Sequence, residues 1–222
     1  SDRPPWTDQP PSFPPAWPRQ GTLIAPLDLD HLLSLPITGP IEPKHLEPTT
    51  LIVLLRRICG RRGVSGNLRL RAQGHALEFT LEAGEASLGP AELRLLRTMF
   101  TVPTGRWELR AKVASSRPDV PAHSLRRLAI EGLRQALDGI PKEELEHHYR
   151  RRQDETVRLT GPAPTIGDEL GLTAGEMASL NALGPIGAAS IPLSEFGRGE
   201  VGSAASLRLV AFLQLHGALE VG

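Results

Sequence analysis

The chain has little of several features that define whole classes of protein. Only one of its 222 residues is a cysteine, Cys59, so a disulfide framework is excluded and a zinc site built on cysteines is not expected. No apolar run approaches the ~18 residues that a membrane-spanning helix needs. The N-terminal stretch SDRPPWTDQPP lacks a basic segment followed by an apolar one, so no signal peptide is predicted and a cytoplasmic location is expected.

The chain also lacks a net charge, because 25 Lys and Arg residues balance 25 Asp and Glu residues. The positive and negative side chains are not evenly distributed along the chain. Residues 48–118 contain twelve basic and five acidic side chains, a net charge of +7. Residues 160–222 contain two basic and six acidic side chains, a net charge of −4. A positive middle and a negative end can attract each other, or can set the polarity of a partner surface.

Residues 1–20 form a Pro-rich arm that contains Trp6 and Trp17. Proline removes amide donors and fixes φ, so neither a helix nor a central strand is predicted there. An extended linker is the main interpretation. The two P-x-x-P patterns, at 11–14 and 15–18, leave a docking peptide as the alternative.

Residues 21–118 are predicted to form an α+β domain. The side chains alternate between apolar and polar in two strands joined by a turn at Gln73-Gly74, and again over 106–113. One face of the hairpin carries Arg on its first strand and Glu on its second, which favours cross-strand pairs. Helical periodicity predicts helices over 48–62 and from Pro90 to Phe100.

The remainder of the chain is predicted to be helical. Residues 119–159 form a helical connector, whose second helix is charged almost throughout. Residues 160–222 form a separate unit with four helices. One of these begins at a capping box formed by Thr173 and Glu176.

Several short motifs follow one another in the middle of the chain. They are RGVSGNLRL (62–70), GHALEF (74–79) with EAGE (82–85), AELRLL (91–96) and GRWEL (105–109). In this order, and over Leu51 to Val113, they resemble the PATAN (PatA N-terminal-like) family of bacterial signalling domains. The resemblance implies a domain of two-component, polarity or motility signalling that acts through protein contacts. It implies no catalytic residue.

The last sixty residues carry LTAGEMASLNALG and SAASLRLVAFLQLHGALEV, which are similar to segments of winged-helix-like units. The fold class expected for the whole chain is therefore α+β. A small antiparallel sheet packed with helices is followed by an all-α winged-helix-like unit. Such a unit raises the question of DNA binding, but the candidate reading helix, 203–215, has Arg208 as its only fixed cation.

Two clusters of potential metal ligands occur, and neither predicts a metal site. Glu144 and His147 are spaced as in di-iron helix bundles, but those sites need a second copy of the motif. Asp28 and Asp30 precede an apolar run, where helix capping is the favoured role. Cys59 is expected to be a buried structural thiol. No catalytic residue, cofactor or metal is predicted.

The leading hypothesis is a non-catalytic bacterial signalling adaptor that binds a protein partner. The residues assigned to partner binding are Leu93, Arg97 and Met99 on the second predicted helix and Arg56 and Arg57 on the first. The alternative is a transcription-related regulator whose winged-helix-like unit contacts nucleic acid. An enzyme with a dispersed site is the third possibility. The sequence identifies neither the partner nor the oligomeric state.

Overall fold

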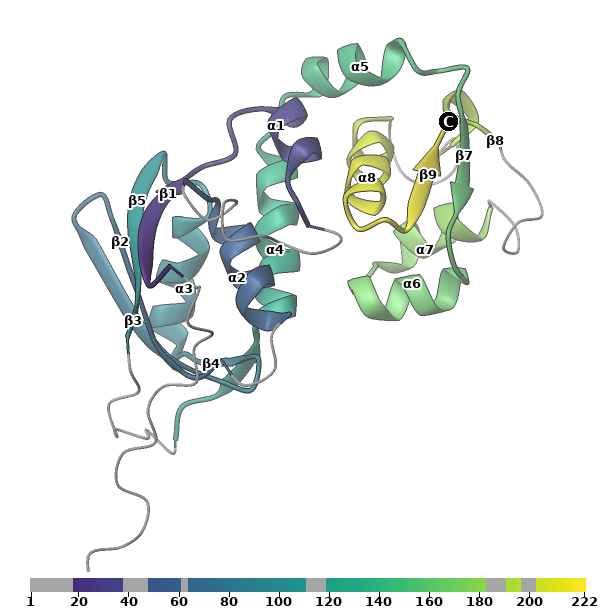
Figure 1. The fold of residues 1–222 in the computed structure, drawn as a ribbon. Helices are drawn as coiled ribbons and strands as arrows, with labels where there is room; N and C mark the ends of the chain where they lie inside the picture. The colour runs from purple at the N-terminus through teal and green to yellow at the C-terminus, as the bar shows by residue number, and fades with distance from the viewer. Residues whose placement is uncertain (1–17, 38–47, 61–63, 111–118, 183–190, 197–202) are drawn as a thin grey trace, which may run out of the picture. The chain divides into compact units, whose positions relative to one another are not determined.

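A computed structural model describes residues 18–37, 48–60, 64–110, 119–182, 191–196 and 203–222, and Figure 1 shows its helices and strands. The chain divides into two compact units. Unit 1 comprises Ser1–Ala25 and Ile41–Gly132, and unit 2 comprises Pro26–Pro40 and Leu133–Gly222. Most of the predicted Pro-rich arm lies outside the described residues.

The division into units differs from the domain boundaries expected from the sequence. The segment Pro26–Pro40 groups with the C-terminal part of the chain. Helix α4 (Leu125–Asp138), expected in a connector, contributes its first residues to unit 1 and its last residues to unit 2. Proline and glycine mark where local structure is interrupted, but they do not show which distant segments pack together.

Unit 1 is built on a six-stranded antiparallel sheet with the strand order β1-β5-β2-β3-β4-β6. Its strands are β1 (Gln20–Ile24), β2 (Gly66–Ala72), β3 (His75–Glu82), β4 (Glu85–Ser87), β5 (Thr104–Arg110) and β6 (Ala122–Ser124). The predicted hairpin and the strand after the second helix are thereby confirmed. Strand β5 inserts between β1 and β2, so its register depends on contacts distant in the sequence.

Two-residue turns join β2 to β3 and β3 to β4, which are neighbours in the sheet. Gln73 and Gly74 link β2 to β3 with φ of 47° and 79°, and Ala83 and Gly84 link β3 to β4 with φ of 50° and 85°. Positive φ at both turn residues matches the right-handed twist of antiparallel strands. Glycine takes the second position of each turn because it adopts this conformation without a steric penalty.

Two helices of unit 1 follow from clear local signals. Helix α2 (Leu51–Cys59) begins at Thr50, whose side chain accepts a hydrogen bond from the Val53 amide at 3.3 Å. Helix α3 (Pro90–Met99) begins with proline, and the Glu92 carboxylate accepts from the Gly89 amide at 2.7 Å. Both helices lie on one side of the sheet (Figure 1).

The alternation of side chains gives the sheet one buried face and one open face. The buried face is apolar, and its side chains are at most 4% exposed: Leu68, Leu70, Leu77, Phe79, Leu81, Trp107 and Leu109. The intervening side chains are charged or polar and are exposed or half-buried. Burial of the apolar set against the helices drives the packing of unit 1.

Unit 2 combines helices with a three-stranded antiparallel sheet in the order β8-β7-β9. The helices are α1 (Leu29–Ser34), α5 (Lys142–Arg150), α6 (Ala163–Leu170), α7 (Ala174–Asn181), the 3₁₀ turn η2 (Leu193–Glu195) and α8 (Ser203–Leu215). The strands are β7 (Thr156–Leu159), β8 (Ile191–Pro192) and β9 (Leu219–Val221). The molecule is thus mixed α+β, as expected.

The all-α character expected of the C-terminal unit is not confirmed, because unit 2 contains a three-stranded sheet. Strands of two to four residues are too short to produce a readable alternation, and β7 begins shortly after the charged helix α5. The capping box at Thr173 and Glu176 is present, with Thr173 accepting from the Glu176 amide at 3.3 Å. Helix α8 supplies much of the core of unit 2, since Leu209 to Leu213 are at most 2% exposed.

Candidate functional site: an arginine-lined hollow on the open sheet face

The open face of the six-stranded sheet concentrates charge in the strands β2, β3 and β5. The register sets the side chains in rows across these strands. In one row Arg69 of β2 lies between Glu78 of β3 and Glu108 of β5. In the next row Arg71 lies between Ala76 of β3 and Arg106 of β5. The first row therefore alternates in sign, and the second row brings two positive charges together.

Arg69, in the first row, and Arg110, further along β5, each pair with an acidic side chain. Arg110 Nη2 lies 2.8 Å from Glu108 Oε2, and Arg69 Nε lies 3.9 Å from Glu78 Oε2. The hydrogen bond from Arg110 lowers the pKa of Glu108, an effect reinforced by the charges of Arg110 and Arg69. The predicted Arg–Glu pairing on the hairpin is thus confirmed at Arg69.

Arg71 and Arg106 differ from the other arginines of this face. They are directly opposite each other on adjacent strands, and both side chains are exposed. Within the described parts of the chain, neither forms an ion pair. Like charges directly opposite each other on neighbouring strands are destabilising, so this pair of guanidinium groups costs folding free energy.

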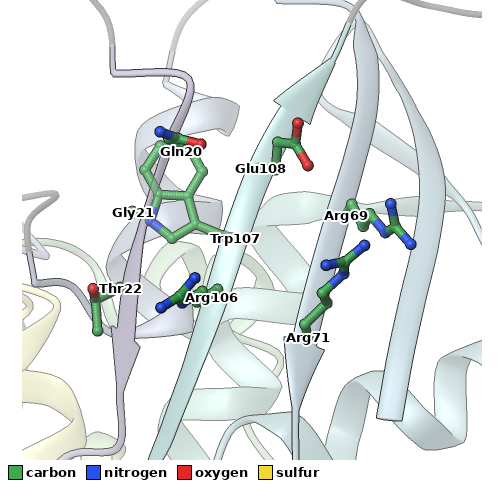
Figure 2. A pocket seen from close by; sticks show the side chains of 8 residues that line it. All are labelled: Gln20, Gly21, Thr22, Arg69, Arg71, Arg106, Trp107 and Glu108. Carbon is green, nitrogen blue, oxygen red and sulfur yellow. The ribbon is translucent and has the colours of Figure 1, made fainter. Parts of the chain in front are cut away.

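A hollow of about 440 Å³ lies over this region of the sheet (Figure 2). Its lining comes from three strands and consists of Gln20, Gly21, Thr22, Arg69, Arg71, Arg106, Trp107 and Glu108. The residues that flank the arginine row, Thr22 and Ala76, are small. The long arginine side chains therefore border a space that their neighbours do not fill.

Trp107 is the member of the lining whose side chain belongs to the buried face, since it lies between Arg106 and Glu108 on β5 and opposite Leu70 on β2. The residue is only 2% exposed, and its indole nitrogen is buried without a hydrogen-bond partner. Figure 2 shows the indole ring between β1 and β5, next to Gly21. A buried donor without an acceptor costs about 1–3 kcal/mol, so this indole lowers the stability of the core and offers nothing to the hollow.

The residues assigned to partner binding on α3 are not all accessible. Met99 is buried at 5% exposure, which contradicts the expectation that it belongs to an exposed patch. Leu93 is half-buried. Arg97 is exposed, and its guanidinium donates to Glu131 on α4 at 3.0 and 3.2 Å. Only part of the α3 set is therefore on the surface.

The two arginines assigned on α2 are also largely enclosed. Arg57 is 7% exposed, so it is not a surface contact, contrary to expectation. Arg56 is half-buried, and burial together with the charge of Arg126 lowers its pKa. Cys59, expected to be buried, is half-buried. Helix α2 is thus mostly a core element.

The acidic and histidine clusters noted in the sequence have structural roles. Asp28 caps α1 by accepting from the His31 amide at 2.7 Å, as expected. Glu144 of α5 accepts from the Leu29 amide at 2.7 Å and so satisfies a second free donor at the start of α1. These two carboxylates fasten the short helix α1 within unit 2.

Asp30 and His148 were not expected to meet, but the structure brings them together. His148 Nδ1 lies 3.0 Å from Asp30 Oδ1, across α5 and α1. Among the residues that the structure describes, no group of three or more His, Cys, Asp or Glu side chains is placed to hold a metal ion. In the same residues, no helix is both long and apolar enough to cross a membrane.

Arg208, on the candidate reading helix α8, forms hydrogen bonds within unit 2. Arg208 of α8 donates from Nε to the Leu137 carbonyl at 3.1 Å and from Nη2 to the Ile140 carbonyl at 3.0 Å. The Leu137 carbonyl is in the last turn of α4 and the Ile140 carbonyl follows the end of the helix, where arginine commonly satisfies free acceptors. Arg208 therefore stabilises a helix end.

No family model matches the sequence, and comparisons with curated proteins and with solved structures found no similar protein.

Proposed function

We propose that this chain is a non-catalytic adaptor of bacterial signalling that binds a protein partner through the open sheet face of unit 1. The observation that carries the proposal is the hollow over β1, β5 and β2, whose lining is polar and positively charged. The resemblance of 51–113 to PATAN domains, which act through protein contacts, points the same way. A cytoplasmic location fits this role and is part of the proposal.

The chemistry of the hollow favours binding over reaction. Guanidinium groups do not release protons at physiological pH, so its three arginines can hold an anion but cannot serve as bases. Glu108 is the one carboxylate in the lining, and its lowered pKa makes it a weak base. Gln20 and Thr22 offer hydrogen bonds without an adjacent activating group.

The alternative, a regulator whose C-terminal unit contacts nucleic acid, receives less support. Phosphate backbones are bound by several lysine and arginine side chains at once. Helix α7 has neither residue, and Arg208 of α8 is held by the carbonyls at the end of α4. We therefore favour a protein partner.

Affinity capture with the full chain, followed by mass spectrometry, tests the adaptor proposal. The matched control is the same chain immobilised after thermal unfolding, which presents the same composition without the folded surface. We expect at least one protein to be enriched by the folded chain, and to bind it again when purified. Equal recovery on both supports, with no direct binding of any purified candidate, would refute the proposal.

A further inference from the structure

We propose that the hollow on the open sheet face binds a phosphate monoester, carried by a phosphorylated side chain of the partner protein. Arg71 and Arg106 hold the phosphate from two neighbouring strands, and Arg69 lies in the next row. The inference rests on the proposed function, because it names the chemical group by which the adaptor recognises its partner.

Three arginines reach the hollow from the open side of the sheet. Residues along a strand alternate between its faces, so Arg69 and Arg71 share the open face on β2, and Arg106 lies on the same face of β5. Arg71 and Arg106 are directly opposite each other, where Cβ atoms lie about 5 Å apart. Both side chains are exposed and longer than this separation, so their guanidinium groups can contact the same anion.

The donors of these arginines are little used within the described residues. Arg71 and Arg106 form no ion pair there, and Arg69 Nε is 3.9 Å from Glu78 Oε2, too far for a hydrogen bond. By contrast, Arg110, which does not line the hollow, donates to a carboxylate at 2.8 Å. The hollow therefore gathers guanidinium groups that can still donate to an anion.

The charge of the lining matches a phosphate monoester more closely than a carboxylate. Three arginines and Glu108 give the lining a net charge of +2. A phosphate monoester carries a charge of about −1.5 to −2 at neutral pH and has three acceptor oxygens, whereas a carboxylate carries about −1 and has two. A phosphate can therefore bind two guanidinium forks at once, which a single carboxylate does less well.

The rest of the open face favours a single phosphate group over a polyanion. Glu78 and Glu108 flank Arg69 in the adjacent row and repel further negative charge. A nucleic acid strand carries a charge on every nucleotide and usually stacks its bases on aromatic side chains. The aromatic residues of the described strands, Phe79 and Trp107, are both buried. One phosphate group on a peptide avoids both difficulties.

The size of the hollow favours a phosphorylated side chain over free phosphate. Its volume is about 440 Å³, whereas one water molecule accounts for about 30 Å³ of the liquid. An ion of five heavy atoms therefore leaves much of the space empty. The peptide that carries the phosphate can fill the remainder, beside the exposed Gln20 of the edge strand β1.

Fluorescence anisotropy with labelled peptides tests the inference. The probes are the capped peptide Gly-Gly-phosphoserine-Gly-Gly and its counterparts with serine or glutamate at the centre. Inorganic phosphate and a deoxyadenosine decamer are competitors, and the ionic strength is held constant. We expect saturable binding of the phosphopeptide, about tenfold or more tighter than that of either other peptide, because it makes additional charge-assisted hydrogen bonds.

The pH dependence of binding gives a second readout that a carboxylate ligand does not share. The second pKa of a phosphate monoester is about 6, so the dianion falls to about a tenth of the ligand at pH 5. The described lining contains no histidine, and the lowered pKa of Glu108 keeps that carboxylate charged over this range. We expect the affinity for the phosphopeptide to rise about tenfold from about pH 5 to 7.5, while that for the glutamate peptide changes little.

Charge-removing variants separate the hollow from the general positive charge of the chain's middle part. Combining Arg71→Gln with Arg106→Gln should weaken binding of the phosphopeptide about tenfold or more. The matched control, Arg94→Gln with Arg127→Gln, removes two exposed positive charges from α3 and α4 and should change the affinity less than about twofold. Far-UV circular dichroism and thermal unfolding show that each variant is folded.

Other outcomes would overturn the inference. Equal binding of the phosphorylated and unphosphorylated peptides would remove the phosphate site, and equal weakening by the control variant would show that only net charge matters. Inorganic phosphate that binds as tightly as the phosphopeptide would show that the hollow takes the free ion. Tighter binding of the decamer would reassign the face to nucleic acid.

Failure of this inference and failure of the adaptor proposal are distinguishable. A purified partner that binds equally before and after phosphatase treatment, and equally to the wild type and the Arg71 and Arg106 double variant, removes the phosphate site and keeps the adaptor. Binding of the phosphopeptide by a chain that captures no protein does the reverse.

Discussion

Arg134 on α4 and Glu176 on α7 form an ion pair with two hydrogen bonds inside unit 2. Arg134 Nη1 lies 2.7 Å from Glu176 Oε1, and Nη2 lies 3.3 Å from Oε2. The same carboxylate accepts from the Thr173 amide at 2.7 Å, and the Arg134 guanidinium lies 4.2 Å from the centre of the Phe212 ring. One carboxylate therefore connects a helix cap to a second helix.

Replacing Glu176 with Gln should destabilise unit 2. Burial raises the pKa of Glu176, but the hydrogen bonds from Arg134 and Thr173 outweigh it and the pKa falls below 4.5. The carboxylate thus stabilises the fold above pH 4.5, and this contribution disappears as the pH falls through the folded-state pKa. We expect Glu176→Gln to lower the free energy of unfolding by about 1–3 kcal/mol at neutral pH.

Chemical denaturation of the wild type and the variant at several pH values measures this effect. The difference between them should shrink as the solution is acidified below the range in which Glu176 is charged. The exposed Glu195, substituted in the same way, serves as the control and should alter stability little. A difference that stays constant down to strongly acidic pH would show that the ion pair is not its source.

Gly132 and Gly167 offer a matched comparison of core packing. A Cβ at Gly132 of α4 would lie 2.3 Å from the ring of Phe100, whereas one at Gly167 of α6 would lie 2.2 Å from the sulfur of Met177. An aromatic ring in a packed core moves as a rigid body, while the end of a methionine can rotate away. We expect Gly132→Ala to cost about 1–3 kcal/mol and Gly167→Ala much less.

Thermal unfolding of the two variants tests the comparison, and a second-site change tests its cause. Replacing the ring with a smaller side chain, as in Phe100→Leu, should recover part of the stability lost by Gly132→Ala, since it opens space where the new methyl group would meet the ring. Additive losses in the double variant would mean that the Phe100 ring is not what the new methyl group meets.

The elements that carry strong local signals could be predicted from the sequence. The turn at Gln73-Gly74, the helix at Pro90 and the capping box at Thr173 all appear where expected. Each depends on a few adjacent residues whose chemistry fixes φ, a hydrogen bond or a burial face. The strand β7 and the grouping of Pro26–Pro40 with unit 2 depend on distant partners instead, and local patterns do not contain that information.

The candidate site could not be predicted from the sequence for the same reason. The alternation showed that Arg69 and Arg71 share a face, and that Arg106 and Arg110 share one. It did not show that β5 pairs with β2 in the register that sets Arg71 opposite Arg106. Met99 and Arg57, which the sequence analysis assigned to partner binding, are buried, because helical periodicity indicates one buried stripe whereas packing encloses these helices further.

Removing one member of the arginine pair should not harm the fold. Arg71→Gln relieves the repulsion from Arg106 and breaks no ion pair within the described residues, so we expect the Tm to stay the same or to rise by ~1–3 °C. Arg69→Gln is the counterpart, because it loses the contact with Glu78 and gains nothing. Differential scanning calorimetry at low ionic strength distinguishes them. A clear drop in Tm for Arg71→Gln would show that Arg71 stabilises the fold despite its position opposite Arg106.

Tyr149 gives a spectroscopic measure of the integrity of unit 2, because it is the only tyrosine in the chain. The residue is 2% exposed, and its hydroxyl donates to Gln214 of α8 at 3.4 Å. Burial raises the pKa of Tyr149 well above its ordinary value of 10.0, although the charge of Arg152 opposes the shift. The stability due to the neutral phenol is therefore complete below pH 10 and is lost as the pH rises beyond it.

An alkaline titration followed by phenolate absorbance should show this shift directly. In denaturant the phenol should ionise near pH 10.0, and in the folded chain the signal should appear only at higher pH, together with loss of the helical circular dichroism signal. The variant Tyr149→Phe should give no phenolate signal at any pH, which confirms the assignment. Ionisation of the folded chain near pH 10, with its circular dichroism intact, would mean that the hydroxyl between α5 and α8 is open to water.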